Sequence, residues 1–439
     1  MFLSCLVVFV SFSNLASSLP RINNVFTSKE QTSKHNEDQL IFVQTIFRHG
    51  DRYPLYIYKN NPNQADSWPT GSLGNLSPTG MDQQLRLGKK LRRRYRDFFS
   101  PKFTYDEIYV RSSEFNRTLA SALSQLIGFY SGTTKRGVDY PDAPGWPLNY
   151  VPVPVHSIPR DQDHVVLGME VTNCERFRRA WNLITLTPEY EQMEQKYQEI
   201  VREAEKVVGN KLLVKVREYV YNIIDNARID KLYGLKPTPD MTTELFNGLS
   251  DLETEITGFQ FGRHLKSRNG VDFSREMAVP LGGGLLNEII DRMSTKVRCL
   301  DRHPSLRSEL RSKRLVGLLL AKAENEECLW INRLKMYAYS GHDFTLSALF
   351  STFEFLESNW NRPGYPSYTS CIAIELRRNT KTGRYYVKVL YIFENETVDI
   401  TSDIGGCERD CTFDRFVQRS QPFLLRNKTD YCESNVGVY

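Results

Sequence analysis

The 439-residue sequence lacks the features that mark membrane, repeat and nucleic-acid-binding proteins. Beyond its first 12 residues no run of eighteen apolar residues occurs, so no membrane anchor is expected in the mature chain. It has no internal repeat and no low-complexity segment, which excludes solenoid and disordered classes. Its formal net charge is only +5, without the concentrated basic patch that nucleic-acid binding needs. We therefore expect an ordinary globular protein, long enough for one large core or two domains.

One stretch is locally basic. The segment Lys89 to Phe98, "KKLRRRYRDF", is the densest basic run, and Leu87, Leu91 and Tyr95 recur around it at four-residue spacing. This pattern predicts a helix with an apolar side facing inward and a solvated basic face. The alternative for the basic face is a site for an anionic partner.

The N-terminus and the cysteines both indicate export. Residues 1–18 contain an apolar stretch followed by small residues, which predicts a signal peptide cleaved near Ser18, although a charged n-region is missing. Eight cysteines are present, and seven remain after removal of Cys5 with the signal. An oxidising compartment favours disulfides, and an odd count leaves one thiol over. Glycosylation sequons, which support a secreted glycoprotein, begin at Asn75, Asn116, Asn395 and Asn427.

The periodicity predicts an α/β fold with a helical insertion. An apolar strand at 39–47, a helix at 78–98 capped by Ser77, and a second strand and helix at 106–130 predict parallel βα units. From 161 to 298 the spacing is mostly helical, and near 334 the βα pattern returns, followed by a hairpin over 370–393. We expect an open mixed sheet flanked by helices. Its catalytic domain would comprise 39–160 and 299–439, with a helical cap domain at 161–298.

Polar residues follow three of these strands. In open α/β sheets, ligands bind outside the carboxyl ends of the strands, so residues far apart in sequence can converge there. Taken singly, each could have a local role: Asp343 as a helix N-cap, or Arg111 as a partner of Glu114. The residues expected to converge are Arg48, His49, Arg52, Arg111, His342 and Asp343.

These residue types suit hydrolysis of phosphate monoesters. Arginine binds phosphate oxygens in bidentate fashion and stays charged. A neutral imidazole can attack phosphorus and form a phosphohistidine, and nearby arginines favour the neutral ring. An aspartic acid can protonate the leaving oxygen and then act as base toward water, so an acidic optimum is expected.

The motifs "TIFRHGDRYP", "YVRSSEFNRTLASAL" and "YAYSGHDFTLSAL" together resemble the histidine acid phosphatase family. Further stretches resemble its prostatic and lysosomal acid phosphatase branch, over about residues 40–432. The resemblance implies a phosphoglycerate mutase-like fold and hydrolysis without metal or other cofactor. It implies His49 as nucleophile and Asp343 as proton donor. Arg48, Arg52, Arg111 and His342 would hold the phosphate, and Arg117 would support the site in a lesser role.

The same resemblance implies disulfides between Cys174 and Cys432 and between Cys407 and Cys411. The usual partner position of Cys371 is Gly234 here, so we predict a Cys299–Cys328 bridge and a free Cys371. The alternative joins Cys371 to one of those two cysteines.

Two further expectations concern surface features. Asn395 is the best glycosylation candidate, followed by Asn75 and Asn427, whereas Asn116 lies beside the predicted site and should be unmodified. The stretch "VPVPVHSIP" forms a dimer contact in the resembling branch, but Tyr150 stands here where Trp is usual. The resemblance thus implies a homodimer, whereas the change at Tyr150 weakens that expectation. His156 within this stretch is a structural or surface residue, or alternatively a proton shuttle or metal ligand.

The leading prediction is a secreted acid phosphatase acting on small phosphate monoesters, with the lysosome lumen as the alternative location. A phytase or inositol-phosphate phosphatase, a lysophosphatidate phosphatase or a phosphotyrosine phosphatase remain open within the family. A metallophosphoesterase would need several more ligands than the seven histidines suggest. A non-catalytic phosphate-binding protein would have no need for both His49 and Asp343.

Overall fold

The computed structural model describes residues 38–147, 149–168, 173–211, 217–263, 265–301, 326–355, 366–408 and 410–437. The predicted signal peptide and most of the segment between Cys299 and Cys328 lie outside these ranges. Within the described chain, no helix is long and apolar enough to cross a membrane.

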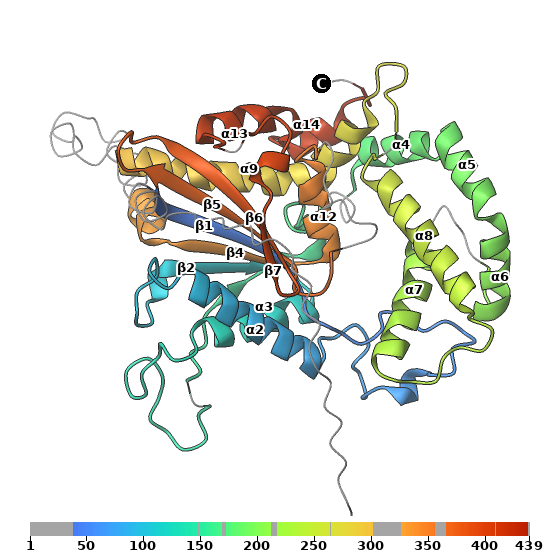
Figure 1. Cartoon of the computed structure of the whole chain (residues 1–439), viewed down its shortest axis with the longest axis horizontal. Helices are drawn as coiled ribbons and strands as arrows, with labels where there is room; N and C mark the ends of the chain where they lie inside the picture. The colour runs from blue at the N-terminus through green and yellow to red at the C-terminus, as the bar shows by residue number, and fades with distance from the viewer. Residues whose placement is uncertain are drawn as a thin grey trace, which may run out of the picture.

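A seven-stranded mixed sheet forms the centre of the molecule (Figure 1). Its order is β3-β2-β4-β1-β5-β6-β7. The first four strands in this order run parallel to one another, and β5, β6 and β7 are antiparallel to their neighbours. The predicted α/β fold class is therefore confirmed. The strands are β1 (Asp38–Arg48), β2 (Ile108–Ser112), β3 (Val155–His156), β4 (Met336–Gly341), β5 (Cys371–Asn379), β6 (Tyr385–Phe393) and β7 (Glu396–Asp399).

Helices cover both faces of this sheet. One face packs against α2 and α3, and the other against α9, α12 and α13, so that a separate apolar core lies on each side. Because β1 is central, its run of Ile, Val and Phe is buried on both faces. These helices are α2 (Pro78–Arg94), α3 (Asn116–Phe129), α9 (Phe273–Asp301), α12 (Asp343–Ser351) and α13 (Phe413–Ser420), with α14 (Lys428–Glu433) near the C-terminus.

Helix α2 has the two sides expected of it. The Ser77 side chain accepts a hydrogen bond from the Gly80 backbone N–H and caps the helix. Leu87, Leu91 and Tyr95 are buried, as their spacing predicts. Lys89 is exposed and Lys90 half-buried, and both line an open pocket of about 650 Å³ that also contains Asn395.

A second group of helices lies beyond the carboxyl ends of the parallel strands, at the right of Figure 1. We call them the cap helices. They have an apolar core of their own that includes Tyr190, Leu249 and Ile256. The cap helices are α4 (Glu175–Ile184), α5 (Pro188–Lys196), α6 (Gln198–Val208), α7 (Arg217–Leu232) and α8 (Thr243–Gln260).

Helix α9 belongs to both parts of the molecule. Near its start, Phe273 and Met277 pack with the cap helices. From Leu285 to Met293 its apolar side chains pack against the sheet instead. The domain division predicted from the sequence stays a prediction, and on these contacts we would move its second boundary from residue 298 to the middle of α9.

Three disulfides tie the chain together. They join Cys174 to Cys432, Cys299 to Cys328 and Cys407 to Cys411. These are the pairs expected from the sequence. Cys371 is a free, buried thiol on β5, opposite Phe47 of β1. Burial raises the pKa of this thiol to about 12, which keeps it protonated and unreactive.

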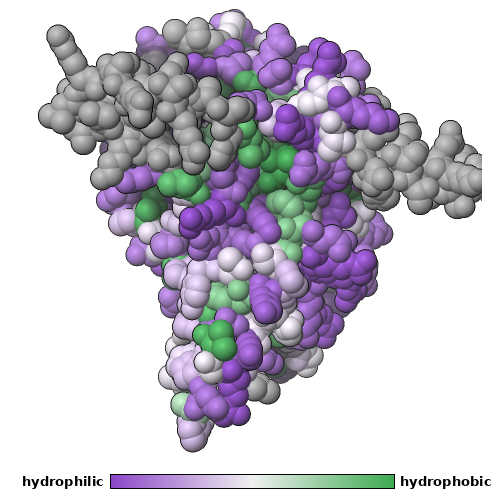
Figure 2. Space-filling view, turned by 90° about the vertical axis from the view of Figure 1, so that its left-hand side faces the viewer, coloured by the Kyte–Doolittle hydropathy of each residue, from purple (hydrophilic) through white to green (hydrophobic). Residues whose placement is uncertain are grey.

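The surface also exposes apolar groups. Figure 2 shows hydrophobic residues between polar ones on the side of the molecule that lies at the left of Figure 1. Large exposed apolar side chains include Tyr105, Leu329 and Trp330. Two of them, Tyr105 and Trp330, line the same pocket, so part of this exposure is gathered in one place.

Candidate active site

The predicted strand ends meet at one edge of the sheet. Arg48 at the end of β1 is in register with Gly341 at the end of β4, and the His49 N–H donates to the Gly341 carbonyl at 3.0 Å. The motif after β1 and the His342–Asp343 pair therefore lie side by side. The chain after β2 joins them, because the Ser113 N–H donates to the Ser340 carbonyl.

Two glycines, Gly50 and Gly80, let the loop that follows β1 lie directly on helix α2. A Cβ added at Gly50 would lie 2.3 Å from the Gly80 carbonyl oxygen, and one at Gly80 would lie 2.1 Å from the backbone carbonyl oxygen of Asp51. No side chain fits at either position without moving backbone. The Gly50 N–H also donates to the Ser121 hydroxyl of α3. The backbone next to His49 is thus fixed from both helices.

His49 is buried, with one nitrogen committed. Its Nδ1 lies 2.7 Å from the Gly50 carbonyl oxygen, which can only accept, so Nδ1 carries the proton and Nε2 keeps its lone pair. Burial, and next to it the Arg117 charge, holds the pKa of His49 well below its ordinary value. The lowered pKa favours the neutral ring, which is the form that a nucleophile requires.

His342 connects Arg117 to the strand ends. Its Nε2 lies 2.9 Å from the Ser113 hydroxyl, and Arg117 donates to its Nδ1 at 3.3 Å. Burial and Arg117 hold the pKa of His342 well below its ordinary value. Both ring nitrogens of His342 thus have protein partners, and the contact through Nδ1 orients Arg117.

Arg48 and Asp343 form an ion pair with a separation of 2.8 Å. Arg48 also donates to the Pro366 carbonyl and lies 4.3 Å from the centre of the Tyr368 ring. Asp343 is the first residue of α12, and its other oxygen accepts the Phe344 N–H at 2.7 Å. The positive end of the helix favours a carboxylate at this position.

Arg52 is held by the cap helix α7, a contact that the sequence did not indicate. Its guanidinium group donates to both oxygens of Asp225, at 2.8 and 3.0 Å, and to the Tyr221 hydroxyl at 3.0 Å. The same hydroxyl lies 3.4 Å from Asp343. Tyr221 and Asp225 are one helical turn apart on α7. Polar residues at this spacing are common on exposed helix faces, so no sequence signal separates these two.

Arg111 does not join the group. It lies within β2 rather than after it, and its side chain makes ion pairs with Asp163 at 2.7 Å and Glu288 at 2.8 Å. In this geometry Arg111 is engaged away from the other site residues, so its expected role as a phosphate ligand gains no support and stays a prediction. Arg117, expected to have a lesser role, lies among the site residues instead. A basic side chain in the first turn of a helix opposes the helix dipole, and that signal could have singled it out.

Arg117 is the least compensated of the site arginines. In the described part of the chain it has no carboxylate within ion-pair distance, and burial together with the Arg52 charge lowers its pKa to about 10. The buried Nε–H groups of Arg48, Arg52 and Arg117 have no hydrogen-bond partner among described residues. Such donors are costly unless an acceptor reaches them, and phosphate oxygens are suitable acceptors.

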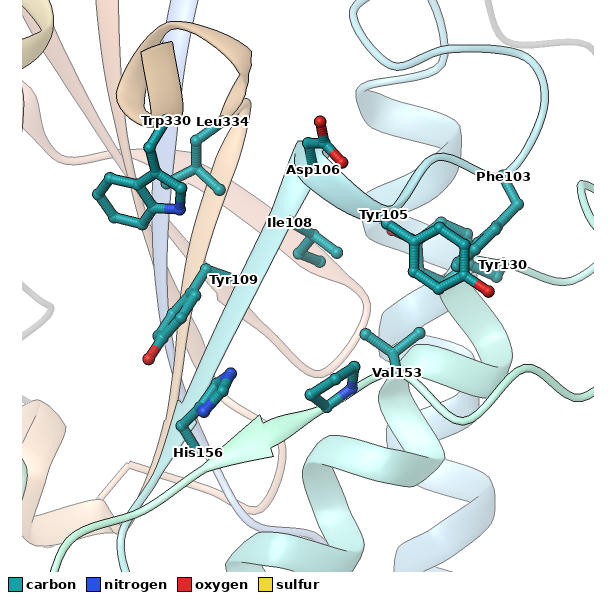
Figure 3. A pocket seen from close by; sticks show the side chains of 11 residues that line it. Phe103, Tyr105, Asp106, Ile108, Tyr109, Tyr130, Val153, His156, Trp330 and Leu334 are labelled. Carbon is teal, nitrogen blue, oxygen red and sulfur yellow. The ribbon is translucent and has the colours of Figure 1, made fainter. Parts of the chain in front are cut away.

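His156 lies in a different pocket, of about 210 Å³, at the β3 edge of the sheet (Figure 3). Its ring stacks on Tyr109, with centroids 4.4 Å apart. Trp330 and Leu334 line the same pocket. This surrounding favours the structural role for His156. Among the described residues no group of three or more potential metal ligands gathers here or elsewhere.

Comparisons with known proteins identify the family of this chain. The family model described as "Histidine phosphatase superfamily (branch 2)" matches residues 39–392. Testicular acid phosphatase of Mus musculus is 29% identical over 396 residues, covering 88% of this chain and 80% of the relative. Prostatic acid phosphatase of Bos taurus is 26% identical over 422 residues, covering 95% and 92%.

Among solved structures, the apo form of Hafnia alvei phytase superposes with a TM-score of 0.59 at 15% identity. The superposition covers 91% of this chain and 99% of the phytase. At this identity the likeness concerns the fold alone. The family model spans most of the chain and both halves of the site, so this chain is a phosphatase that belongs to branch 2 of the histidine phosphatase superfamily.

Proposed function

We propose that this chain is a secreted acid phosphatase that hydrolyses small phosphate monoesters through a phosphohistidine on His49, without a metal ion. One observation carries the proposal. His49 has its Nδ1 proton committed to the Gly50 carbonyl, which leaves Nε2 as a nucleophile among Arg48, Arg52 and Arg117.

In the first step the Nε2 lone pair forms a bond to phosphorus while the bond to the leaving oxygen breaks. The arginines stabilise the charge on the phosphoryl oxygens, and each such preorganised donor is worth about 100- to 1000-fold in rate. The acid form of Asp343 gives its proton to the leaving oxygen. The products are an alcohol and a phosphorylated His49.

In the second step Asp343, now a carboxylate, takes a proton from water. The water oxygen bonds to phosphorus, the bond to Nε2 breaks, and phosphate leaves with His49 restored. His342 contributes by orienting Arg117 through its Nδ1. It reaches the phosphate directly only if this contact gives way.

Secretion and modification belong to the same proposal. They are supported by the predicted signal peptide and by three disulfides of the kind found in exported proteins. Asn395 is exposed in the turn between β6 and β7. The side chains of Asn75 and Asn427 make local hydrogen bonds instead, to Gly71 and to the start of α14. Asn395 therefore stays the best glycosylation site, and delivery to the lysosome lumen is the alternative location.

The test is hydrolysis of 4-nitrophenyl phosphate across pH 4–8 in excess chelator, by the wild type and by His49→Ala. Acid-favouring activity that resists the chelator and disappears in the variant is the expected result. Activity that the chelator removes would contradict metal independence, and activity that survives in His49→Ala would contradict the nucleophile.

A further inference from the structure

The carboxylate that the cap places on Arg52 has no role in the reaction steps above. Asp225 is 7% exposed and Arg52 only 1%, and they share two hydrogen bonds. A buried bidentate pair of this kind is held in a fixed geometry. The Tyr221 hydroxyl occupies the same guanidinium nitrogen as one Asp225 oxygen, so both terminal nitrogens of Arg52 are engaged by α7.

The pair changes the charge that a substrate meets. Asp225 compensates Arg52, whereas Arg48 pairs with Asp343, whose negative charge is absent when it carries the proton for the first step. Burial lowers the pKa of both site histidines, which favours their neutral forms. Within the described chain this leaves Arg117 without a carboxylate partner, and Arg48 as well once Asp343 is protonated. Glu253 of α8 adds little negative charge, because burial raises its pKa to about 7 and it lies 3.1 Å from Arg228.

Two further charged residues lie near these groups. Asp51, next to Arg52, is buried, and its Oδ2 accepts hydrogen bonds from the hydroxyls of Ser77 and Tyr233 rather than from an arginine. Arg160, which also lowers the pKa of His342, is exposed and lies over the Phe115 ring. A single phosphate group matches this small positive balance. A ligand with several phosphates would bring extra negative charge close to Asp225.

Resting on the function proposed above, we propose that Asp225 is a specificity-determining residue that selects substrates with one phosphate group and disfavours polyphosphorylated ones. It does so by compensating Arg52 from the cap, outside the sheet motifs that supply the reacting groups.

The experiment compares kcat/KM for 4-nitrophenyl phosphate and for inositol hexakisphosphate at pH 5 in the wild type and in Asp225→Asn. The asparagine keeps the size and one acceptor for Arg52 but removes the charge. Asp251→Asn, on the exposed side of the neighbouring helix α8, is the matched control because it removes the same charge away from the site. We expect Asp225→Asn to raise the ratio of hexakisphosphate to monophosphate kcat/KM by at least about tenfold, and Asp251→Asn to leave it unchanged.

An unchanged or lowered ratio in a folded, active Asp225→Asn would overturn the inference while leaving the phosphatase proposal intact. An inactive wild type would contradict the phosphatase proposal instead. In that event, calorimetric titration of the same proteins with orthophosphate and with the hexakisphosphate still tests the charge balance. Asp225→Asn should then raise the ratio of hexakisphosphate to orthophosphate affinity by at least about tenfold. If Asp225→Asn does not fold, Asp225→Ser takes its place. This variant is purified in inorganic phosphate, because phosphate offers Arg52 a replacement anion.

Discussion

The two sides of the candidate active site differ in what positions their residues. The sheet side places Arg48 at the end of β1 and His49, His342 and Asp343 after the ends of β1 and β4, where backbone hydrogen bonds hold the two strand ends together. The cap side contributes Tyr221 and Asp225 from a single helix, through side-chain contacts alone. In the proposed mechanism the reacting groups therefore come from the sheet, whereas a cap helix adjusts the charge that the substrate meets.

The largest effect should come from the proton donor on the sheet side. Asp343→Asn cannot protonate a leaving alkoxide, so glycerol 2-phosphate hydrolysis should fall by about 100- to 10,000-fold. The loss should be much smaller for 4-nitrophenyl phosphate, because its leaving group needs little protonation. Initial rates with both substrates measure the difference. Equal losses would mean that Asp343 acts mainly through its ion pair with Arg48.

A second contrast separates Arg117 from Arg111. Arg117→Ala should lower kcat/KM by about 100- to 1000-fold, because a preorganised donor to the transition state is lost. Arg111→Ala should instead destabilise the fold by about 3–5 kcal/mol, since Asp163 and Glu288 lose their partner. Kinetics and urea unfolding of both variants give the comparison. A folded, stable Arg111→Ala that has lost activity would restore the role first predicted for it.

The sheet side and the cap side should also make contributions to the free energy of unfolding that change with pH in opposite directions. His49 and His342 have folded pKa values below that of an unfolded histidine, so they bind protons preferentially in the unfolded state. Their contribution to stability therefore falls as the pH drops below about 6.5, by up to about 1.4 kcal/mol per pH unit for each ring. Glu253 behaves in the opposite way. Its pKa is raised to about 7 by burial, so its contribution falls as the pH rises from about 4.3 to 7.

Urea unfolding of His49→Gln and Glu253→Gln at pH 5, 6 and 7 tests both signs. The first variant should lose less stability than the wild type on acidification. The second should be more stable than the wild type at pH 7, by about 2 kcal/mol, and should lose that advantage toward pH 5. Parallel pH dependences in all three proteins would show that neither buried group titrates as described.

The smallest effect should be that of Tyr221. Tyr221→Phe removes one hydroxyl that contacts Arg52 and lies 3.4 Å from Asp343, without changing the charge of the site. A few-fold loss in kcat/KM is expected, in line with about 0.5–1.5 kcal/mol for one hydrogen bond. Tyr105→Phe, on an exposed ring outside the site, is the control. A loss above 100-fold would move Tyr221 from a positioning role into the chemistry.

The sequence predicted the sheet side well because its information is local. The strand 39–47, the Ser77 cap and the residues after two strands each follow from periodicity or capping within a short window. Arg111 was misplaced because the pattern could not tell whether β2 ended before or after it, and β2 ends at Ser112. Tyr221 and Asp225 could not be found, because their partner Arg52 lies about 170 positions away and the packing of α7 decides the contact.

The Cys299–Cys328 bridge has a consequence for how purified protein would behave. A single cut of the peptide chain between these two cysteines leaves both fragments covalently joined. The Cys174–Cys432 bridge has the same effect over a much longer span, since it links α4 to α14 near the C-terminus. Material nicked within either span would therefore migrate as one species on a denaturing gel until reductant is added. An intact band under non-reducing conditions is for this reason no proof of an uncut chain.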